Sequence, residues 1–175
     1  MPMIDLTYPE GALEPGARAE AVERLTAALL RHEGASDNEQ TRAMSWTLVH
    51  ELPAGALNVG GAPAEEPVYR VFVTVPRGTL LQGPGPVGSA SRRNLVREVA
   101  EILLEAEGGG YSEVEAGRVY CLVREVDDGY WGGMGTTFRM EDIVATATPE
   151  APQTPVSEAA RAAIAGLNAR RGAAA

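Results

Sequence analysis

Leu48-Val49-His50-Glu51 returns further along the chain as Leu122-Val123-Arg124-Glu125. Leu29-Leu30-Arg31-His32-Glu33-Gly34 returns at the same offset as Leu103-Leu104-Glu105-Ala106-Glu107-Gly108. Thr7-Tyr8-Pro9-Glu10-Gly11 returns as Thr74-Val75-Pro76-Arg77-Gly78, at a smaller offset. Matches in one order indicate an internal repeat. The change of offset places extra residues in the Gly- and Pro-rich stretch 81–88, which is typical of an inserted loop.

Each copy of the repeat has the pattern strand, helix, strand. Residues 4–8 and 69–75 are rich in β-branched, aromatic and other apolar residues, and both stretches end at a Pro-x-Gly turn. Residues 15–32 carry apolar side chains at helical spacing, from Pro15 to a stop at Gly34, and the second copy repeats this spacing before Gly108. We expect strands at 43–51 and 118–126 to complete the two copies. Crossovers of this length imply parallel, right-handed pairing within each copy.

The predicted fold class is α/β (α+β), with tandem β-α-β units that form a four-stranded sheet and two helices on one face. Residues 1–62 form the first unit, 63–68 a linker, 69–145 the second unit, and 146–175 an Ala- and Pro-rich C-terminal tail. We expect the tail to be mobile and dispensable, with a short helix at most, around residues 157–168. Nothing in the chain is left to cover the other face of the sheet, so we expect oligomerisation.

The composition excludes several kinds of partner and site. A net charge of −9 and a pI of about 4.8 argue against a nucleic-acid partner, which needs a basic surface. The single cysteine, Cys121, forbids an intrachain disulfide, and its apolar neighbours favour a buried structural thiol. His32 and His50 are too few for a metal cluster, so no metal or cofactor is expected. We find no signal peptide and no apolar run of about 18 residues, and therefore expect a cytoplasmic protein without membrane contact.

Pro2 has a chemical use of its own. Aminopeptidases remove an initial methionine before a small residue, and removal of Met1 would turn Pro2 into a secondary amine. An α-amino group has a pKa of about 7.7–8.0, and a dry apolar pocket lowers this pKa by disfavouring the charged form. Such an amine is a general base near neutral pH. The second copy begins with Tyr69 at the matching position and has no amine to offer.

The tandem β-α-β pattern and the opening Pro2-Met3-Ile4-Asp5-Leu6-Thr7 resemble the tautomerase superfamily over roughly residues 2–144. The chain looks most similar to a fused form of 4-oxalocrotonate tautomerase. Each half keeps a Glu-x-x-x-Gly stretch ahead of a Gly-rich hairpin, with Leu57-Asn58-Val59-Gly60-Gly61 in the first and Trp131-Gly132-Gly133-Met134-Gly135 in the second. The resemblance implies catalysis by Pro2 and a compact homotrimer.

The chain departs from the family where the resemblance places a dicarboxylate grip. The arginine that follows the first turn glycine is replaced by Ala12 and Thr79, and a second arginine is replaced by Trp46 and Tyr120. A phenylalanine that walls the pocket is replaced by Leu57 and Trp131. Arg77 lies at the same strand end as Thr79, so the resemblance favours Arg77 as the substrate anchor, with a solvated turn residue as the alternative. Trp46, Tyr120 and Trp131 are candidates for an aromatic substrate pocket, or else pack in the core or an interface. We interpret His50 as an edge or interface residue.

The resemblance implies a cofactor-independent isomerase that interconverts enol and keto forms of a small α-keto or enol carboxylic acid. Pro2 would be the general base, and Arg77 would bind the carboxylate. A first alternative is hydration, dehalogenation or decarboxylation with protonated Pro2 as the acid, which needs a carboxylate that activates water. A second alternative is a non-catalytic binding or assembly module. The sequence leaves the physiological substrate open.

Overall fold

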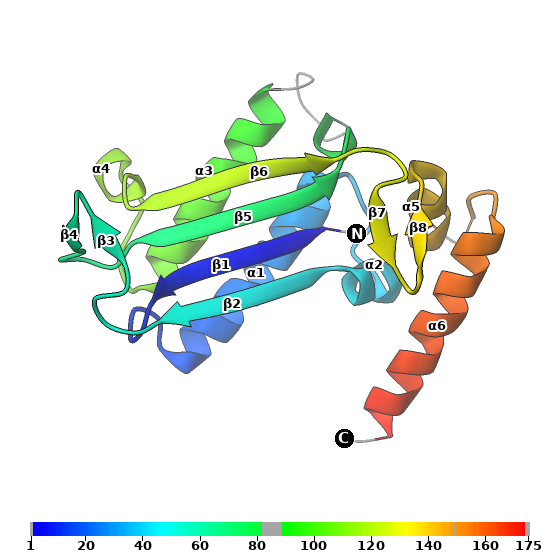
Figure 1. The fold of residues 1–175 in the computed structure, drawn as a ribbon, viewed down its shortest axis with the longest axis horizontal. Coiled ribbons are helices and arrows are strands. Elements are labelled where there is room, and N and C mark those ends of the chain that lie inside the picture. The colour runs from blue at the N-terminus through cyan, green and yellow to red at the C-terminus, as the bar shows by residue number, and fades with distance from the viewer. Residues whose placement is uncertain (1, 82–88, 149, 174–175) are drawn as a thin grey trace.

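The computed structural model describes residues 2–81, 89–148 and 150–173, and its main body is one mixed sheet with helices on one face (Figure 1). The first copy contains β1 (Met3–Pro9), α1 (Pro15–His32), α2 (Glu39–Met44) and β2 (Trp46–Leu52). The second contains β5 (Tyr69–Pro76), the 3₁₀ turn η1 (Thr79–Leu81), α3 (Ser89–Ala106), α4 (Glu113–Ala116) and β6 (Val119–Val126). The predicted loop insertion at 81–88 lies, from residue 82 on, outside the described residues.

The sheet order is β2-β1-β5-β6, which confirms the predicted four-stranded sheet. Strands pair in parallel within each copy, β1 with β2 and β5 with β6. The two copies meet at an antiparallel pair, β1 with β5, in which Met3 lies opposite Thr74. This pairing brings the first residue of the chain's first strand to the end of β5 and the turn that follows it.

The repeat is also visible in two matching side-chain contacts. The turn glycine Gly11 donates its N–H to Glu51 Oε1 at 3.4 Å, and the equivalent Gly78 donates to Glu125 Oε1 at 3.2 Å. Both glycines have positive φ, 79° and 90°, a conformation that costs a residue with a Cβ about 1–2 kcal/mol. The glycine of the Pro-x-Gly turn and the glutamate of the repeat therefore form the same hydrogen bond in both copies.

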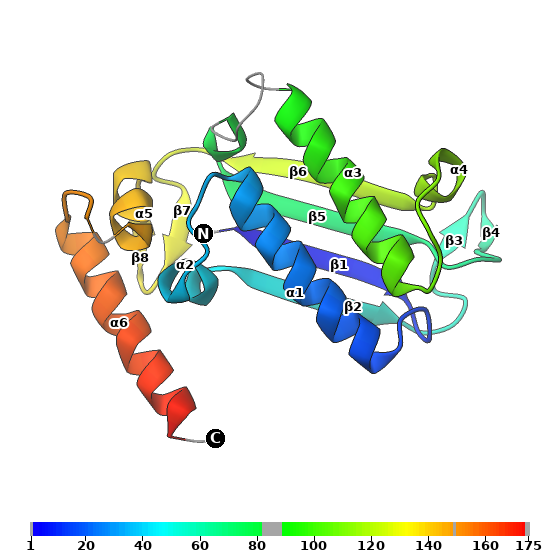
Figure 2. The same cartoon turned by 180° about the vertical axis from the view of Figure 1, so that it is seen from behind.

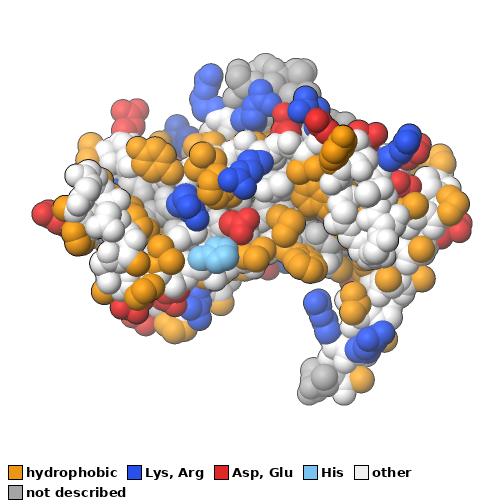
Figure 3. Space-filling view, viewed as in Figure 1, with side chains coloured by type: hydrophobic (Ala, Val, Ile, Leu, Met, Phe, Trp, Pro, Cys, Tyr) orange, Lys and Arg blue, Asp and Glu red, His pale blue; other side chains and the backbone are white. Residues whose placement is uncertain are grey.

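Helices α1 and α3 cover one face of the sheet, in front of it in Figure 2. Alternate strand residues point into the core beneath them, among them Leu6, Tyr8, Val71 and Val73. The opposite face carries no layer in the described chain and exposes large side chains from both edge strands, among them Trp46, Leu48, Tyr120 and Leu122 (Figure 3). Exposed apolar side chains gathered on one face are typical of surfaces that contact another molecule.

The second strand of the first copy begins later than predicted. Residues 43 and 44, which the apolar pattern assigned to a strand, end the short helix α2. Asn38 caps this helix, because its side chain accepts from the Thr41 N–H at 2.9 Å while the Thr41 hydroxyl accepts from the Asn38 N–H at 3.0 Å. This reciprocal cap holds the backbone in a helix until Met44, which is buried.

The C-terminal region contains more helix than the sequence indicated. Each copy is followed by a short hairpin, β3 (Asn58–Val59) with β4 (Ala62–Pro63) in the first and β7 (Trp131–Gly133) with β8 (Thr136–Phe138) in the second. After the second hairpin the chain forms α5 (Met140–Ala147) and α6 (Pro155–Gly172). Helix α6 buries Ala160 and Ile164 and belongs to a cluster with Trp131, Phe138 and Ile143. Its far half extends away from the sheet (Figure 1). An 18-residue packed helix thus stands where we expected a mobile tail with a short helix.

No helix among the described residues combines the length and the apolar character needed to cross a membrane.

Candidate functional site

The start of β1 opens on a small cavity of about 180 Å³, which we call the Pro2 cavity. Pro2 is buried, and its carbonyl oxygen accepts a hydrogen bond from the Trp46 N–H at 3.2 Å, which ties the first residue to β2. The walls are largely apolar and come from the end of α1, from α2 and from α5; they include Leu30, Met44, Met140, Ile143 and Val144. Glu33, Thr41, Thr79 and Thr148 supply the polar side chains.

Glu33 is a buried acid in this cavity, and sequence reasoning missed it. It is the residue after α1, where Gly34 turns the chain with a φ of 70° and so ends the helix. Its side chain is only 9% exposed and accepts a hydrogen bond from the Thr79 hydroxyl at 2.9 Å. Burial raises the pKa of Glu33, while the positive N-terminal amine and the Thr79 hydrogen bond lower it. The cavity therefore contains a carboxyl group with an increased tendency to hold its proton.

Arg77, the predicted anchor, lies at the same end of the sheet as Pro2 but does not line the cavity. The backbone N–H of Arg77 donates to the Val126 carbonyl at 2.8 Å. The Arg77 guanidinium is exposed and pairs with the Asp127 carboxylate at 2.5 Å. The structure brings Thr79 to the cavity in its place. Arg77 is exposed and paired with Asp127. This position agrees better with the interpretation of Arg77 as a solvated turn residue than with its interpretation as a substrate anchor.

The three aromatic candidates lie in three different places. Trp46 is 63% exposed on the open face of the sheet, beside the Pro2 backbone. Trp131 is buried against Phe138 and Ile143, with Met3 packed against the same cluster. Tyr120 lies toward the opposite end of the sheet, because it pairs with Arg70. None of the three lines the Pro2 cavity in the described chain, so they do not form one pocket within a single copy.

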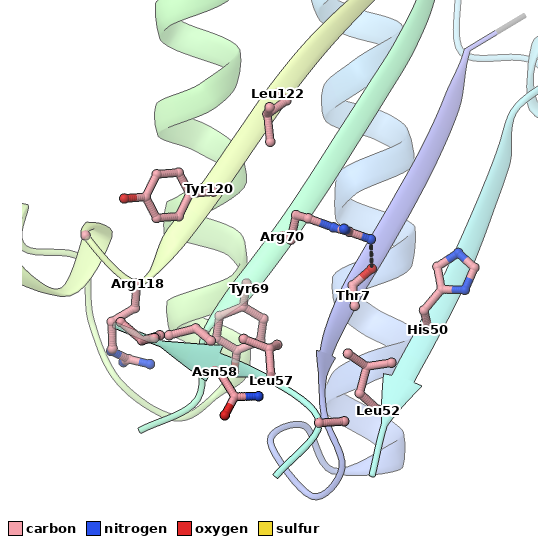
Figure 4. A pocket seen from close by; sticks show the side chains of 14 residues that line it. Thr7, His50, Leu52, Leu57, Asn58, Tyr69, Arg70, Arg118, Tyr120 and Leu122 are labelled. Atoms are coloured by element: carbon pink, nitrogen blue, oxygen red, sulfur yellow. Dashed lines mark hydrogen bonds between the residues drawn. The ribbon is translucent and has the colours of Figure 1, made fainter. Parts of the chain in front are cut away.

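Tyr120 instead lines a larger, open cavity of about 880 Å³ at the other end of the strands (Figure 4). We call it the Tyr69 cavity, because Tyr69 lines it. Further lining residues are Thr7, His50, Arg70 and Arg118. Arg70 extends from β5 toward β1 and donates to the Thr7 hydroxyl at 3.2 Å. Tyr69 occupies in the second copy the position that Pro2 has in the first, but Glu107, the repeat equivalent of Glu33, is not among the described residues that line this cavity.

Other reactive groups have structural explanations. His50 is half exposed on β2, where its Nε2 lies 3.2 Å from Asp5 Oδ1. Burial raises the pKa of the Cys121 thiol to about 12, so the thiol stays protonated at neutral pH, as a structural cysteine does. Within the described ranges, no group of His, Cys, Asp and Glu side chains is placed to hold a metal ion.

Comparison with solved structures identifies the fold. A member of the cis-3-chloroacrylic acid dehalogenase family superposes with a TM-score of 0.66 at 14% identity, covering 94% of this chain and 99% of that one. A fused 4-oxalocrotonate tautomerase, crystallised as a symmetric trimer, gives 0.59 at 15% identity over 77% of this chain and 93% of that one. A macrophage migration inhibitory factor-like protein from Entamoeba histolytica gives 0.57 at 15% identity over 78% and 98%.

These similarities show that the chain has the fold of the tautomerase superfamily, as the repeat and the opening residues predicted. At these identities they show the fold alone. No protein-family model matches the chain, and no curated protein sequence matches it.

Proposed function

We propose that this chain is a tautomerase-superfamily enzyme that interconverts keto and enol forms of a small carbonyl compound, with the amine of Pro2 as general base after loss of Met1. The observation that carries the proposal is the position of Pro2. It is buried at the head of β1 and lines a cavity whose walls are largely apolar. Such surroundings lower the pKa of an amine and leave its lone pair free near pH 7.

The decisive experiment compares chains with and without Met1. A retained Met1 makes the Pro2 nitrogen an amide, which has no basic lone pair. Intact-mass measurement first establishes the processing state, and ketonisation of phenylenolpyruvate is then followed by ultraviolet absorbance. We expect the processed chain to be active and the Met1-retaining chain to be folded and inactive. Equal rates for the two forms would eliminate Pro2 as the base.

The predicted substrate, a small α-keto or enol acid, stays a prediction. An acid needs a cationic partner, and Arg77 would have to leave Asp127 and turn toward the cavity to provide one. Arg77→Ala tests this directly. A higher KM for an acid substrate, at unchanged kcat, would support an anchoring role, because lost ground-state binding appears in KM.

A second candidate function is hydration of an activated double bond, with protonated Pro2 as the acid. The observation behind it is that Glu33 lines the Pro2 cavity, because this reaction needs a carboxylate that activates water; Glu33 would have to lose its proton first, which its raised pKa disfavours. The two functions differ in their products. Hydration adds one water to the substrate, which mass spectrometry detects, whereas tautomerisation leaves the mass unchanged.

We also infer that the working form is a homotrimer. Trp46 and Tyr120 are 63% and 71% exposed on the uncovered sheet face, where they would be unusual in a monomer. The fused 4-oxalocrotonate tautomerases that share the fold crystallised as trimers. Sedimentation or light scattering at micromolar concentration measures the assembly, and a stable monomer would contradict this inference.

A further inference from the structure

The two copies of the repeat offer an internal comparison for Glu33. Its equivalent is Glu107, since both precede the glycine that follows the long helix of their copy. Glu107 accepts from Arg118 Nη1, with distances of 3.2 and 3.0 Å to its two carboxylate oxygens. Among the described residues, Glu33 has no basic side chain as a partner and accepts only from the Thr79 hydroxyl. The same position is thus charge-paired in one copy and unpaired beside the Pro2 cavity in the other.

The chemistry of the Pro2 cavity is that of a neutral site. No Lys, Arg or His side chain lines it among the residues that the structure describes, and Glu33 is the ionisable side chain present. A substrate carboxylate inside this cavity would find no basic side chain among the described lining residues to pair with it, and burying an unpaired charge is costly. Cavities of about 150 Å³ hold benzene, so about 180 Å³ fits a compound of roughly six to eight non-hydrogen atoms.

We propose that Glu33 is the acid partner of Pro2, and that the Pro2 cavity prefers a small neutral ketone or enol to a carboxylate. This proposal rests on the proposed function, since it needs Pro2 as the base. Beyond the proposed function, it names the second proton-transfer group and the charge of the preferred substrate.

The reaction step balances with these two groups. The Pro2 nitrogen takes a proton from the carbon beside the carbonyl, and the electrons of that C–H bond form a carbon–carbon double bond. The carbonyl π electrons move to oxygen, which takes the proton of the Glu33 carboxyl group. The products are an enol, a prolinium and a Glu33 carboxylate, and passage of one proton from prolinium to carboxylate restores the enzyme.

The surroundings favour the protonation states that this step needs. Glu33 lies at the C-terminal end of α1, where the helix dipole disfavours a negative charge. The positive amine at residue 1, which is lost with Met1, acts in the opposite direction, and Thr41, Thr79, Thr148 and the apolar α5 residues face the cavity without charge. Burial therefore raises the pKa of Glu33 and favours its protonated form.

The test uses two substrates of equal size that differ in charge, 2,4-pentanedione and acetoacetate. The processed, full-length chain is assayed by proton NMR for hydrogen–deuterium exchange at the carbon between the carbonyls. The variant Glu33→Gln keeps the shape and an acceptor for Thr79 but cannot donate a proton in this way. Glu107→Gln makes the same change in the other copy and is the matched control. Thermal unfolding confirms that both variants are folded.

Relative to the uncatalysed exchange of each compound at the same pH, we expect the unmodified chain to accelerate exchange of 2,4-pentanedione at least about 10-fold more than that of acetoacetate, with a bell-shaped pH profile. Glu33→Gln should lower kcat/KM for 2,4-pentanedione by about 100-fold, remove the decline at high pH, and bring the two substrates closer together. Glu107→Gln should leave the profile unchanged. If Glu33→Gln does not fold, the substrate preference and the bell shape of the unmodified chain still decide.

The two proposals fail differently. An active enzyme that needs a free Pro2 but prefers acetoacetate, or that keeps its pH profile in Glu33→Gln, would overturn the role of Glu33 alone. A processed chain that accelerates exchange of neither compound would overturn this proposal, and if it also leaves phenylenolpyruvate unchanged, the proposed function fails with it.

Discussion

Ile164→Ala tests whether α6 is part of the fold. Ile164 is 2% exposed near the middle of α6, whereas Leu167 on the same helix is 48% exposed. Removing a fully buried isoleucine side chain costs about 2–5 kcal/mol, and we expect the lower half of this range because the site is at the margin of the molecule. For a chain of this size, 1 kcal/mol corresponds to about 2–4 °C in Tm, so the shift should be about 5–10 °C.

The matched control is Leu167→Ala, which should change the free energy of unfolding by no more than about 0.5 kcal/mol. Urea titrations followed by circular dichroism give both values. Trp131 belongs to the cluster that Ala160 of α6 joins, so in a Trp46→Phe background its fluorescence reports on that cluster alone. If Ile164→Ala costs no more than Leu167→Ala, the helix contributes nothing and the sequence-based expectation of a dispensable tail is correct.

Three further predictions address the acid, the open face and the turns. Burial raises the pKa of Glu33 above its ordinary 4.5. The contribution of Glu33 to stability is therefore complete below pH 4.5 and is lost as pH rises through the folded-state pKa. The urea midpoint of the unmodified chain should accordingly fall between pH 4 and pH 8 relative to that of Glu33→Gln. Leu122→Asp should dissociate the assembly in sedimentation experiments without unfolding the chain, because the side chain is already 43% exposed. Gly78→Ala, at a φ of 90°, should cost about 1–2 kcal/mol in thermal unfolding, while Gly16→Ala, in the first turn of α1 with open space around it, should be neutral or stabilising.

The fold could be predicted because its main signals are local and occur twice. Pro15 and Gly34 mark the two ends of α1 by backbone preference alone, and the observed helix Pro15–His32 matches the predicted range. Helix α2 also had a local signal, since Asn38 and Thr41 have the spacing of a reciprocal cap. The apolar run that includes Met44 was instead interpreted as a strand, because periodicity alone does not distinguish short apolar segments.

The positions of the aromatic side chains could not be predicted in the same way. Trp131 lies opposite Phe138 in the β7–β8 hairpin and packs on α5 and α6. Its burial depends on how three elements meet, and no pattern in the neighbouring residues encodes that meeting. The position of Tyr120 is set by its pairing with Arg70 in the β5–β6 register. That pairing can be predicted only when the strand boundaries and the sheet order are both known.

Glu33 did have a signal in the sequence. An acid directly after the last turn of a helix meets the negative end of the helix dipole, which disfavours its charge. The repeat places an acid there twice, and the chain also supplies Arg118 for one of the two. An unfavourable acid kept without a basic partner, at the end of the helix beside the chain's first strand, is better explained by the chemistry of the Pro2 cavity than by stability. The difference between the copies is therefore informative: the second copy has Tyr69 and a Glu107 paired with Arg118, whereas the first has Pro2 and an acid with an increased tendency to hold its proton.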